Sequence, residues 1–121
     1  MFIRNAIDTD IQSIYEIAQQ EGWKTFSIEK IQQLLITSRI IVIEVNNEVV
    51  GYTRFLTDET VTLYITELVV SKTHRKKGYA KALIDYLLAQ YPSVRIELLS
   101  ENNSFYEKLH FRNIGTGYRL P

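Results

Sequence analysis

The sequence predicts an α/β fold with a mixed, mostly antiparallel sheet flanked by helices. The chain has 121 residues and 45% hydrophobic residues, which suits one domain with a substantial core. Apolar, β-branched runs follow one another between residues 40 and 70, separated by short polar turns as in antiparallel hairpins. A strand–helix–strand pattern comes next, and such a pattern requires a parallel pair in the sheet.

The N-terminal third predicts a short strand at Phe2–Asn5 followed by two helices. We expect Asp8 to cap the first helix and Gly22 to end it. Ser27 is the candidate N-cap of the second helix. The apolar positions that recur at helical spacing are Ile11, Ile14, Tyr15 and Ala18 in the first helix and Ile31, Leu34 and Leu35 in the second.

Three strands are predicted in the middle of the chain. Ile40–Val45 is a β-branched run typical of a buried strand. Asn46 and Asn47 form a hairpin turn that leads into a strand at Val49–Leu56. A second polar turn then precedes a long strand at Val61–Val70.

The C-terminal third adds two helices and two strands. Pro92 ends the first of these helices, whose apolar stripe consists of Ala80, Leu83, Ile84, Leu87, Leu88 and Tyr91. Val94–Leu99 is a strand, Asn103–Leu109 a short helix and Phe111–Arg119 a last strand. The predicted order is βααβββαβαβ, in one domain that spans residues 1–121.

Composition excludes several classes of function. Fourteen Lys and Arg balance fourteen Asp and Glu, which argues against a nucleic-acid partner. The chain has no cysteine, so thiolate metal sites and cysteine nucleophiles are absent, and we expect no metal. No targeting signal or membrane-spanning stretch is recognisable, which predicts a cytoplasmic protein without a membrane partner.

The stretch from Leu68 to Leu83 combines the end of a strand, a basic loop and the start of a helix. Five Lys or Arg and no acidic residue lie between Glu67 and Asp85. Free N–H groups at a helix N-terminus bind phosphate, and Gly78 lets a ligand approach the backbone. A solvated basic loop is the alternative. The stretch is neither a Walker A loop nor a Rossmann fingerprint, because it has only one glycine.

At these residues the sequence resembles the GNAT superfamily of acyl-CoA-dependent N-acetyltransferases. Arg75, Gly78 and Ala80 match its signature Arg/Gln-x-x-Gly-x-Gly/Ala. Phe105-Tyr106 and Phe111 match its second signature, Phe-Tyr-x-x-x-Gly-Phe. The order of elements also matches, so the resemblance covers essentially the whole chain and implies a GNAT-like sheet.

Two departures from the family pattern concern the C-terminal region. His110 stands where the family normally has glycine. The chain also has only one clear closing strand, and the span from Leu99 to Tyr106 is short, which predicts a stunted last helix. Both departures affect the C-terminal wall of the acceptor pocket.

The resemblance implies acetyl-CoA as co-substrate and assigns residues to it. By this resemblance, the backbone of Leu68, Val69 and Val70 pairs with the pantetheine arm. The amide of Val69 or Val70 is the candidate that stabilises negative charge on the thioester carbonyl. The basic loop and the start of the helix hold the phosphates. The full set of candidate residues is Leu68, Val69, Val70, Arg75, Lys76, Lys77, Gly78, Tyr79, Ala80, Lys81 and Asn103.

Tyr106 and Glu67 are the candidate catalytic residues. Tyr106 matches the family position that donates a proton to the departing thiolate, with packing alone as the alternative. Glu67 is a candidate base, acting directly or through water. The alternatives for Glu67 are a place at the rim of the sheet or an ion pair with Arg95. His74 lies in the phosphate loop and is rejected as a base, and His110 is interpreted as a turn residue.

The acceptor site is expected between the first two helices and the middle strands. Trp23 and Phe26 form an apolar lid, while Tyr52, Arg54 and Tyr64 line the floor. The aromatic residues are core residues in the alternative reading. Arg54 suits an acidic group on the acceptor, or else forms an internal salt bridge with Asp58 or Glu67.

The expected function is transfer of an acetyl group from acetyl-CoA to a primary amine by direct attack in a ternary complex. The alternative is a non-catalytic acyl-CoA-binding or sensing module with the same fold. The acceptor is a small molecule or a peptide, and the resemblance allows a homodimer.

Overall fold

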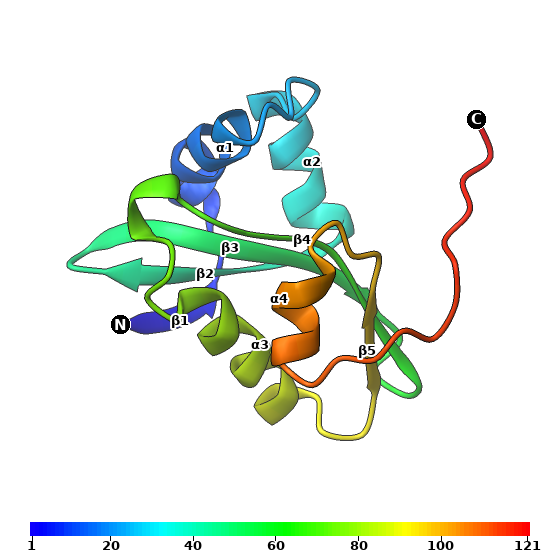
Figure 1. Ribbon diagram of the computed structural model, residues 1–121. Helices are drawn as coiled ribbons and strands as arrows, with labels where there is room; N and C mark the ends of the chain where they lie inside the picture. The colour runs from blue at the N-terminus through cyan, green and yellow to red at the C-terminus, as the bar shows by residue number, and fades with distance from the viewer.

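One sheet of five strands runs through the computed structural model, which describes residues 1–121, and helices cover both of its faces (Figure 1). The predicted α/β class is therefore confirmed. The elements are β1 (Phe2–Asn5), α1 (Ile11–Gln20), α2 (Ile28–Thr37), β2 (Arg39–Val45), β3 (Glu48–Thr57), β4 (Thr62–Val70), α3 (Tyr79–Gln90), β5 (Arg95–Leu98) and α4 (Asn103–Lys108).

The strands lie in their order along the chain, β1-β2-β3-β4-β5. Neighbours from β1 to β4 are antiparallel; short turns join β2 to β3 and β3 to β4, whereas α1 and α2 connect β1 to β2. The connection from β4 to β5 passes through α3 and makes this last pair parallel. Pairing between them covers only Thr62–Ile65 of β4, so the remainder of β4 has no neighbour on that side.

The core consists of two apolar clusters, one on each face of the sheet. On one face α1 and α2 pack on the sheet through Ile14, Ile17 and Ile31, which meet Val42 and Val69. On the other face α3 packs through most of its predicted stripe, and Leu83 and Leu87 are fully buried against β2, β3 and β4. The prediction is wrong for Leu88, which is 52% exposed. Figure 1 shows these two helical layers above and below the sheet.

Most predicted turns and caps are confirmed. The side chain of Ser27 accepts a hydrogen bond from the amide of Lys30 and begins α2. Asn46 and Asn47 both have positive φ, 53° and 63°, as a two-residue hairpin requires. The prediction that Asp8 caps α1 is wrong. Asp8 lies in a short 3-10 turn (Asp8–Asp10), in which the carboxylate of Asp10 accepts the N–H of Ile7 at 2.8 Å.

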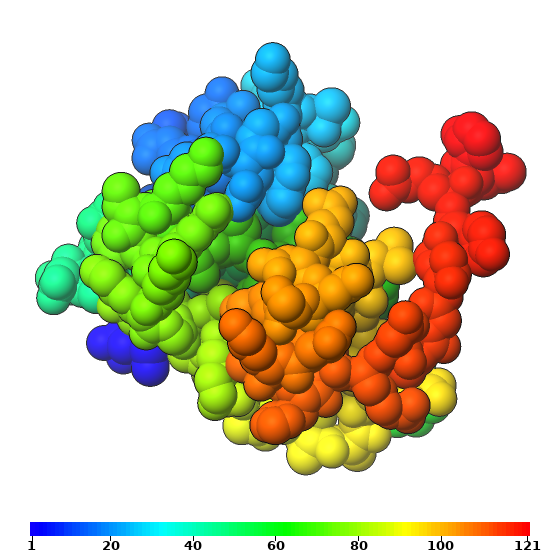
Figure 2. All heavy atoms as spheres, in the orientation of Figure 1, coloured from blue at the N-terminus to red at the C-terminus, as the bar shows by residue number.

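The prediction of a last strand at Phe111–Arg119 is also wrong. This segment forms no ladder with β5, and Figure 2 shows its end standing away from the body of the protein. Two glycines in the segment weaken any strand, and Asn113 holds the amide of Gly115 at 2.9 Å in a local turn. Local side-chain bonds thus compete with pairing to the sheet.

His110 ends α4 in the left-handed conformation, with φ of 70°. The amides of His110 and Phe111 donate to the carbonyls of Glu107 and Tyr106, both at 3.0 Å, which is the bonding pattern of a Schellman motif. Glycine is favoured at this position because it has no Cβ. His110 is therefore a turn residue, as interpreted from the sequence.

Replacing His110 by glycine is expected to stabilise the protein, since it removes the steric penalty of a left-handed side chain. The expected gain in the free energy of unfolding is about 1 kcal/mol. Urea denaturation of His110→Gly beside the wild type measures it. A loss of stability would show that the imidazole makes a contact worth more than the strain.

None of the helices is both long enough and apolar enough to cross a membrane. No group of three or more His, Asp or Glu side chains is placed to hold a metal ion.

Candidate functional site

A β-bulge in β4 determines which side chains face α1 and α2. The register with β3 shifts so that Arg54 opposes Glu67 and Phe55 opposes Ile65, which leaves Thr66 as the extra residue. An extra residue reverses the alternation of faces along a strand. Ile65 accordingly packs in the cluster under α3, whereas Val69 packs in the cluster under α1 and α2. Glu67 shares the face of Val69 and is likewise turned toward α1 and α2.

Beyond the bulge, β4 presents an open edge. Ser71 donates its N–H to the carbonyl of Val50 at 2.7 Å, so the backbone of Ser71 faces β3. Adjacent residues of a strand point their backbone groups in opposite directions. The N–H of Val70 therefore faces the open edge, while that of Val69 faces β3. Of the two amides proposed from the sequence, only the Val70 amide is placed to meet a ligand.

The basic loop leads from this open edge to the N-terminus of α3. Lys76 and Gly78 adopt left-handed conformations with φ of 63° and 83°, so the chain turns sharply before the helix. Gly78 is the N-cap, and no side chain bonds to the first free amides of α3. A Cβ at Gly78 would meet no atom within 4 Å, so the space in front of the helix is open. Such a terminus binds anions.

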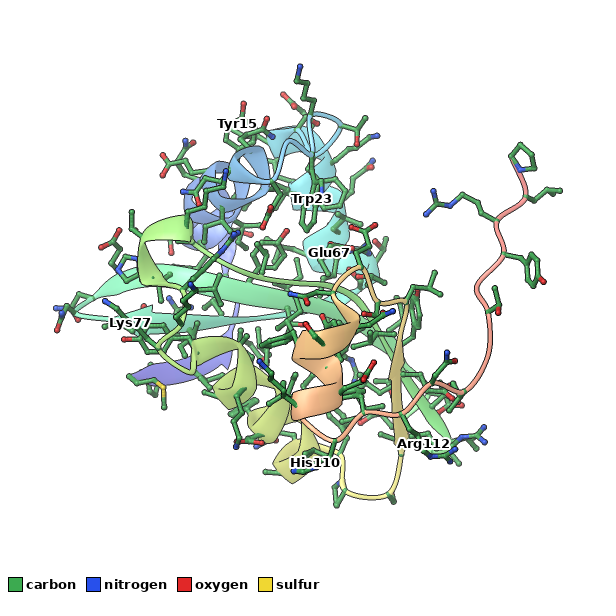
Figure 3. All side chains as sticks on the ribbon, in the orientation of Figure 1. Tyr15, Trp23, Glu67, Lys77, His110 and Arg112 are labelled. Carbon is green, nitrogen blue, oxygen red and sulfur yellow. The ribbon has the colours of Figure 1, made fainter.

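The four cations near this terminus differ in their partners. Arg75 pairs with Glu21 and donates through Nε to the carbonyl of Val70 at 3.0 Å. Lys81 pairs with Asp85 at 2.7 Å. Lys76 and Lys77 are exposed and have no acidic partner. Lys72, at the start of the loop, is likewise exposed and has no acidic partner, so Lys76 and Lys77 are the two free cations next to α3; Figure 3 shows Lys77 on the outer side of the loop.

Glu67 and Arg54 form a two-pronged ion pair across β3 and β4. Arg54 donates to the two carboxylate oxygens through Nε at 2.7 Å and Nη2 at 2.6 Å. The side chain of Arg54 is only 16% exposed and that of Glu67 only 9%. The internal salt bridge, one of two alternatives for Arg54, is therefore confirmed. The suggested pair between Glu67 and Arg95 is wrong.

Tyr106 lies in α4, which has only six residues, as the short preceding segment predicts. Its ring packs edge-on against Phe105 and Phe111, with centroids 5.0 and 5.5 Å apart. Burial raises the pKa of the Tyr106 phenol above its ordinary value. The group is therefore protonated at neutral pH. Asn103 begins the same helix and is exposed, and Asn102 rather than Asn103 caps it.

A cavity of about 930 Å³ lies between α3, β5, α4 and the segment after α4. Tyr106, Asn103 and Lys81 line it, whereas the basic loop and the open edge of β4 do not. Figure 2 shows α4 (orange) next to α3 (green) on this side of the molecule. One side of the cavity is the unpaired edge of β5, where the predicted last strand is missing.

Trp23 and Phe26 lie together in the loop between α1 and α2. Their rings meet edge-on with centroids 5.7 Å apart, and both are half-buried. Trp23 packs on the cluster that includes Tyr52 and Val69, so the loop covers the face of the sheet that carries Glu67 (Figure 3). Tyr64 is half-buried and opposes Leu56 on β3.

Tyr52 carries the one buried side-chain polar atom that has no hydrogen-bond partner. The residue is 1% exposed and pairs across the strands with Val69. Burial, with the nearby carboxylate of Glu67, raises the pKa of its phenol well above its usual range. Buried hydroxyls without a partner are rare in proteins, and a ligand or water commonly satisfies them.

Removing this hydroxyl is expected to leave the free protein at least as stable. In Tyr52→Phe the ring and its packing remain, and an unsatisfied polar group is lost. The free energy of unfolding should stay unchanged or rise by about 1 kcal/mol. Urea denaturation in the absence of ligand measures this. A loss of similar size would show that a buried water satisfies the hydroxyl.

Two residues at the end of α1, Gln20 and Glu21, were not predicted from the sequence. Gln20 accepts the backbone N–H of Lys72 at 3.0 Å, and Glu21 forms the ion pair with Arg75. Both contacts join segments about fifty residues apart in the chain, so no local sequence pattern predicts them. Tyr79 and Ala80 are half-buried in the first turn of α3.

Comparison with known protein families identifies one match. Residues 37–113 match the family described as Acetyltransferase (GNAT) domain. No curated protein sequence matches the chain.

Several solved structures share the fold. An acetyltransferase, GNAT family protein SP0256 from Streptococcus pneumoniae, superposes with a TM-score of 0.83 at 21% identity, covering 99% of this chain and 96% of that one. A ribosomal-protein-alanine N-acetyltransferase from Brucella melitensis gives 0.77 at 16% identity, covering 99% and 98%. Ard1 from Thermoplasma volcanium gives 0.76 at 27% identity, covering 92% and 82%.

Proposed function

The chain belongs to the GNAT acetyltransferase family, and from this premise we propose that it transfers an acetyl group from acetyl-CoA to a primary amine. One observation supports the proposal above all. The open edge of β4 leads directly into an uncapped helix N-terminus that carries two free lysines. A long ligand could pair its polar arm with the open edge of β4 and place its terminal phosphates at the N-terminus of α3.

The residues present fit acetyl-CoA. The first amides of α3, with Lys76 and Lys77, hold the phosphates, and Gly78 leaves open space in front of them. Leu68 and Val70 offer the backbone edge to the pantetheine arm. Tyr79, Ala80 and Lys81 begin α3 beside this region, and Asn103 lines the cavity next to α4 together with Lys81. When bound, acetyl-CoA supplies the acetyl thioester that the amine attacks.

The chain contributes positioning and proton handling. The Val70 N–H faces the open edge of β4, where it stabilises negative charge that develops on a carbonyl oxygen. Tyr106 holds its proton at neutral pH and donates it to the thiolate that leaves. Positioning of the two reactants then supplies much of the remaining rate enhancement.

Glu67 takes the proton of the amine, through water. Arg54 holds the carboxylate in one orientation, and each oxygen keeps a second lone pair for a further hydrogen bond. Trp23 and Phe26 lie over this face of the sheet, and Tyr52, Arg54 and Tyr64 form its floor. The acceptor amine enters on this side.

A thiol-release assay with acetyl-CoA tests the function. The acceptors are polyamines, amino acids, aminoglycosides and peptides with free N-termini, and mass spectrometry identifies the acetylated product. Acetylation of one class at a rate above hydrolysis supports the enzyme. Tight binding of acetyl-CoA without transfer to any acceptor would instead indicate a sensing module.

A glycine pair in the chain tests the phosphate site. Gly78 and Gly22 have similar φ, 83° and 77°, and a Cβ at either would meet no atom within 4 Å. Alanine at each should therefore lower stability equally, by about 1 kcal/mol. Only Gly78→Ala places a methyl group in front of α3, and it should weaken CoA binding about tenfold, equivalent to about 1.4 kcal/mol.

Titration calorimetry with CoA measures this difference, and Gly22→Ala serves as the matched control. Equal affinities in the two variants would reject the phosphate site at α3.

A further inference from the structure

The end of α1 is attached to the basic loop by several contacts. Gln20 Oε1 accepts the N–H of Lys72 at 3.0 Å, and Gln20 Nε2 lies 3.5 Å from the hydroxyl of Ser71. The carboxylate of Glu21 pairs with the guanidinium of Arg75. The last residue of α1 and its C-cap residue thus hold the loop at two points, its start and Arg75.

The side chain of Arg75 donates hydrogen bonds to two partners within the protein. Its Nε donates to the carbonyl of Val70 at 3.0 Å, and its Nη2 donates to Glu21. The Val70 carbonyl is the last backbone acceptor of β4 before the chain turns into the loop. The Arg75 side chain therefore bridges the end of the strand, the loop and the end of α1. Its charge is balanced by Glu21, unlike the charges of Lys76 and Lys77.

We propose that Glu21 and Gln20 are positioning residues for acetyl-CoA, and that Arg75 is an internal strut of the phosphate loop and not a phosphate ligand. This inference rests on the proposed function. Glu21 orients Arg75, Arg75 fixes the end of β4 relative to the loop, and Gln20 fixes the Ser71–Lys72 backbone. The loop amides, Lys76 and Lys77 are thereby held in place before the ligand arrives. This lowers the entropic cost of ordering the loop when the ligand binds.

Substitution of Glu21 distinguishes the two roles of Arg75 by the sign of its effect. If Arg75 is a strut, Glu21→Gln loosens the loop and weakens CoA binding about fivefold, the equivalent of a partly exposed charged contact of about 1 kcal/mol. If Arg75 is a phosphate ligand, Glu21→Gln releases it and CoA binds more tightly. Glu16→Gln, an exposed position on the same helix, is the matched control and should have no effect.

A double-mutant cycle completes the test, with CoA as the titrant in calorimetry. Arg75→Met should weaken binding as much as Glu21→Gln, and the double variant should be no weaker than either single variant. The exchanged pair, Glu21→Arg with Arg75→Glu, should restore part of the affinity, which a general loss of structure cannot do. In turnover assays the single variants should raise the KM for acetyl-CoA and leave kcat unchanged.

Unchanged or tighter CoA binding in Glu21→Gln would overturn the inference, as would additive effects in the double variant. In either case the wild type still binds CoA and transfers acetyl groups, so the proposed function stands. A wild-type protein that does not bind CoA would overturn both together.

Discussion

The Tyr106→Phe variant is expected to lose about 100-fold in kcat, the usual effect of removing a general acid. The phenol is half-buried, and burial raises its pKa, so it holds a proton that it can give to a leaving thiolate. Phenylalanine keeps the ring and its contacts with Phe105 and Phe111. Affinity for acetyl-CoA and thermal stability should therefore change little. A fall in kcat without a matching rise in KM marks an interaction made mainly in the transition state.

Tyr91→Phe is the control for this variant. The Tyr91 hydroxyl accepts a hydrogen bond from Arg39 at 2.9 Å, and the residue lies at the far end of α3 from the basic loop. Its removal should leave kcat unaffected. Steady-state kinetics with the best acceptor compares both variants with the wild type. If Tyr106→Phe is as active as Tyr91→Phe, Tyr106 is a packing residue and another group protonates the thiolate.

The sheet and its helices were predictable because their signals are local. Period-two and period-3.6 patterns, the Ser27 cap and the Asn46–Asn47 turn each act within a few residues, and each formed as expected. The elements of the proposed phosphate site were predictable for the same reason. A strand end, a basic loop, a glycine and an amphipathic helix follow one another without interruption between Leu68 and Leu83.

The features that the sequence did not predict depend on contacts between distant residues. No motif marks Thr66 as a bulge, yet the bulge turns Glu67 to the face of α1 and α2. The partner of Arg75 lies on α1, and the sequence suggested phosphate instead. The strand expected after α4 failed because alternation alone does not ensure a partner; local turns and two glycines compete with pairing to β5.

The second large effect is expected at Asp10, which is 4% exposed and anchors the N-terminus. Its carboxylate accepts from Arg4 through Nη1 at 2.7 Å and Nη2 at 2.9 Å, and from the backbone of Ile7. Arg4 also pairs with Glu44 at 2.6 Å. The pair therefore ties β1, the turn before α1 and β2 together.

Asp10→Asn should lower the free energy of unfolding by about 3 kcal/mol, because it removes the buried carboxylate and leaves the half-buried Arg4 with an incomplete set of partners. The amide is isosteric with the carboxylate, so packing is preserved. Asp8→Asn in the same turn is the matched control; Asp8 is exposed, and its replacement should change stability by less than about 0.5 kcal/mol. Similar losses in both variants would show that the turn and not the ion pair is responsible.

The pH dependence of stability separates the charge of Asp10 from its shape. Hydrogen bonds from Arg4 hold the pKa of Asp10 below its ordinary value. A carboxyl group with a lowered folded-state pKa stabilises the protein fully above its unfolded-state pKa of about 3.9 and loses that contribution as the pH falls toward the folded-state value. The stability difference between wild type and Asp10→Asn should therefore be constant above about pH 5 and shrink below it. Urea denaturation from neutral to acidic pH measures this difference, and one that stays constant down to the acid end would mean that the ionised carboxylate contributes nothing beyond its shape.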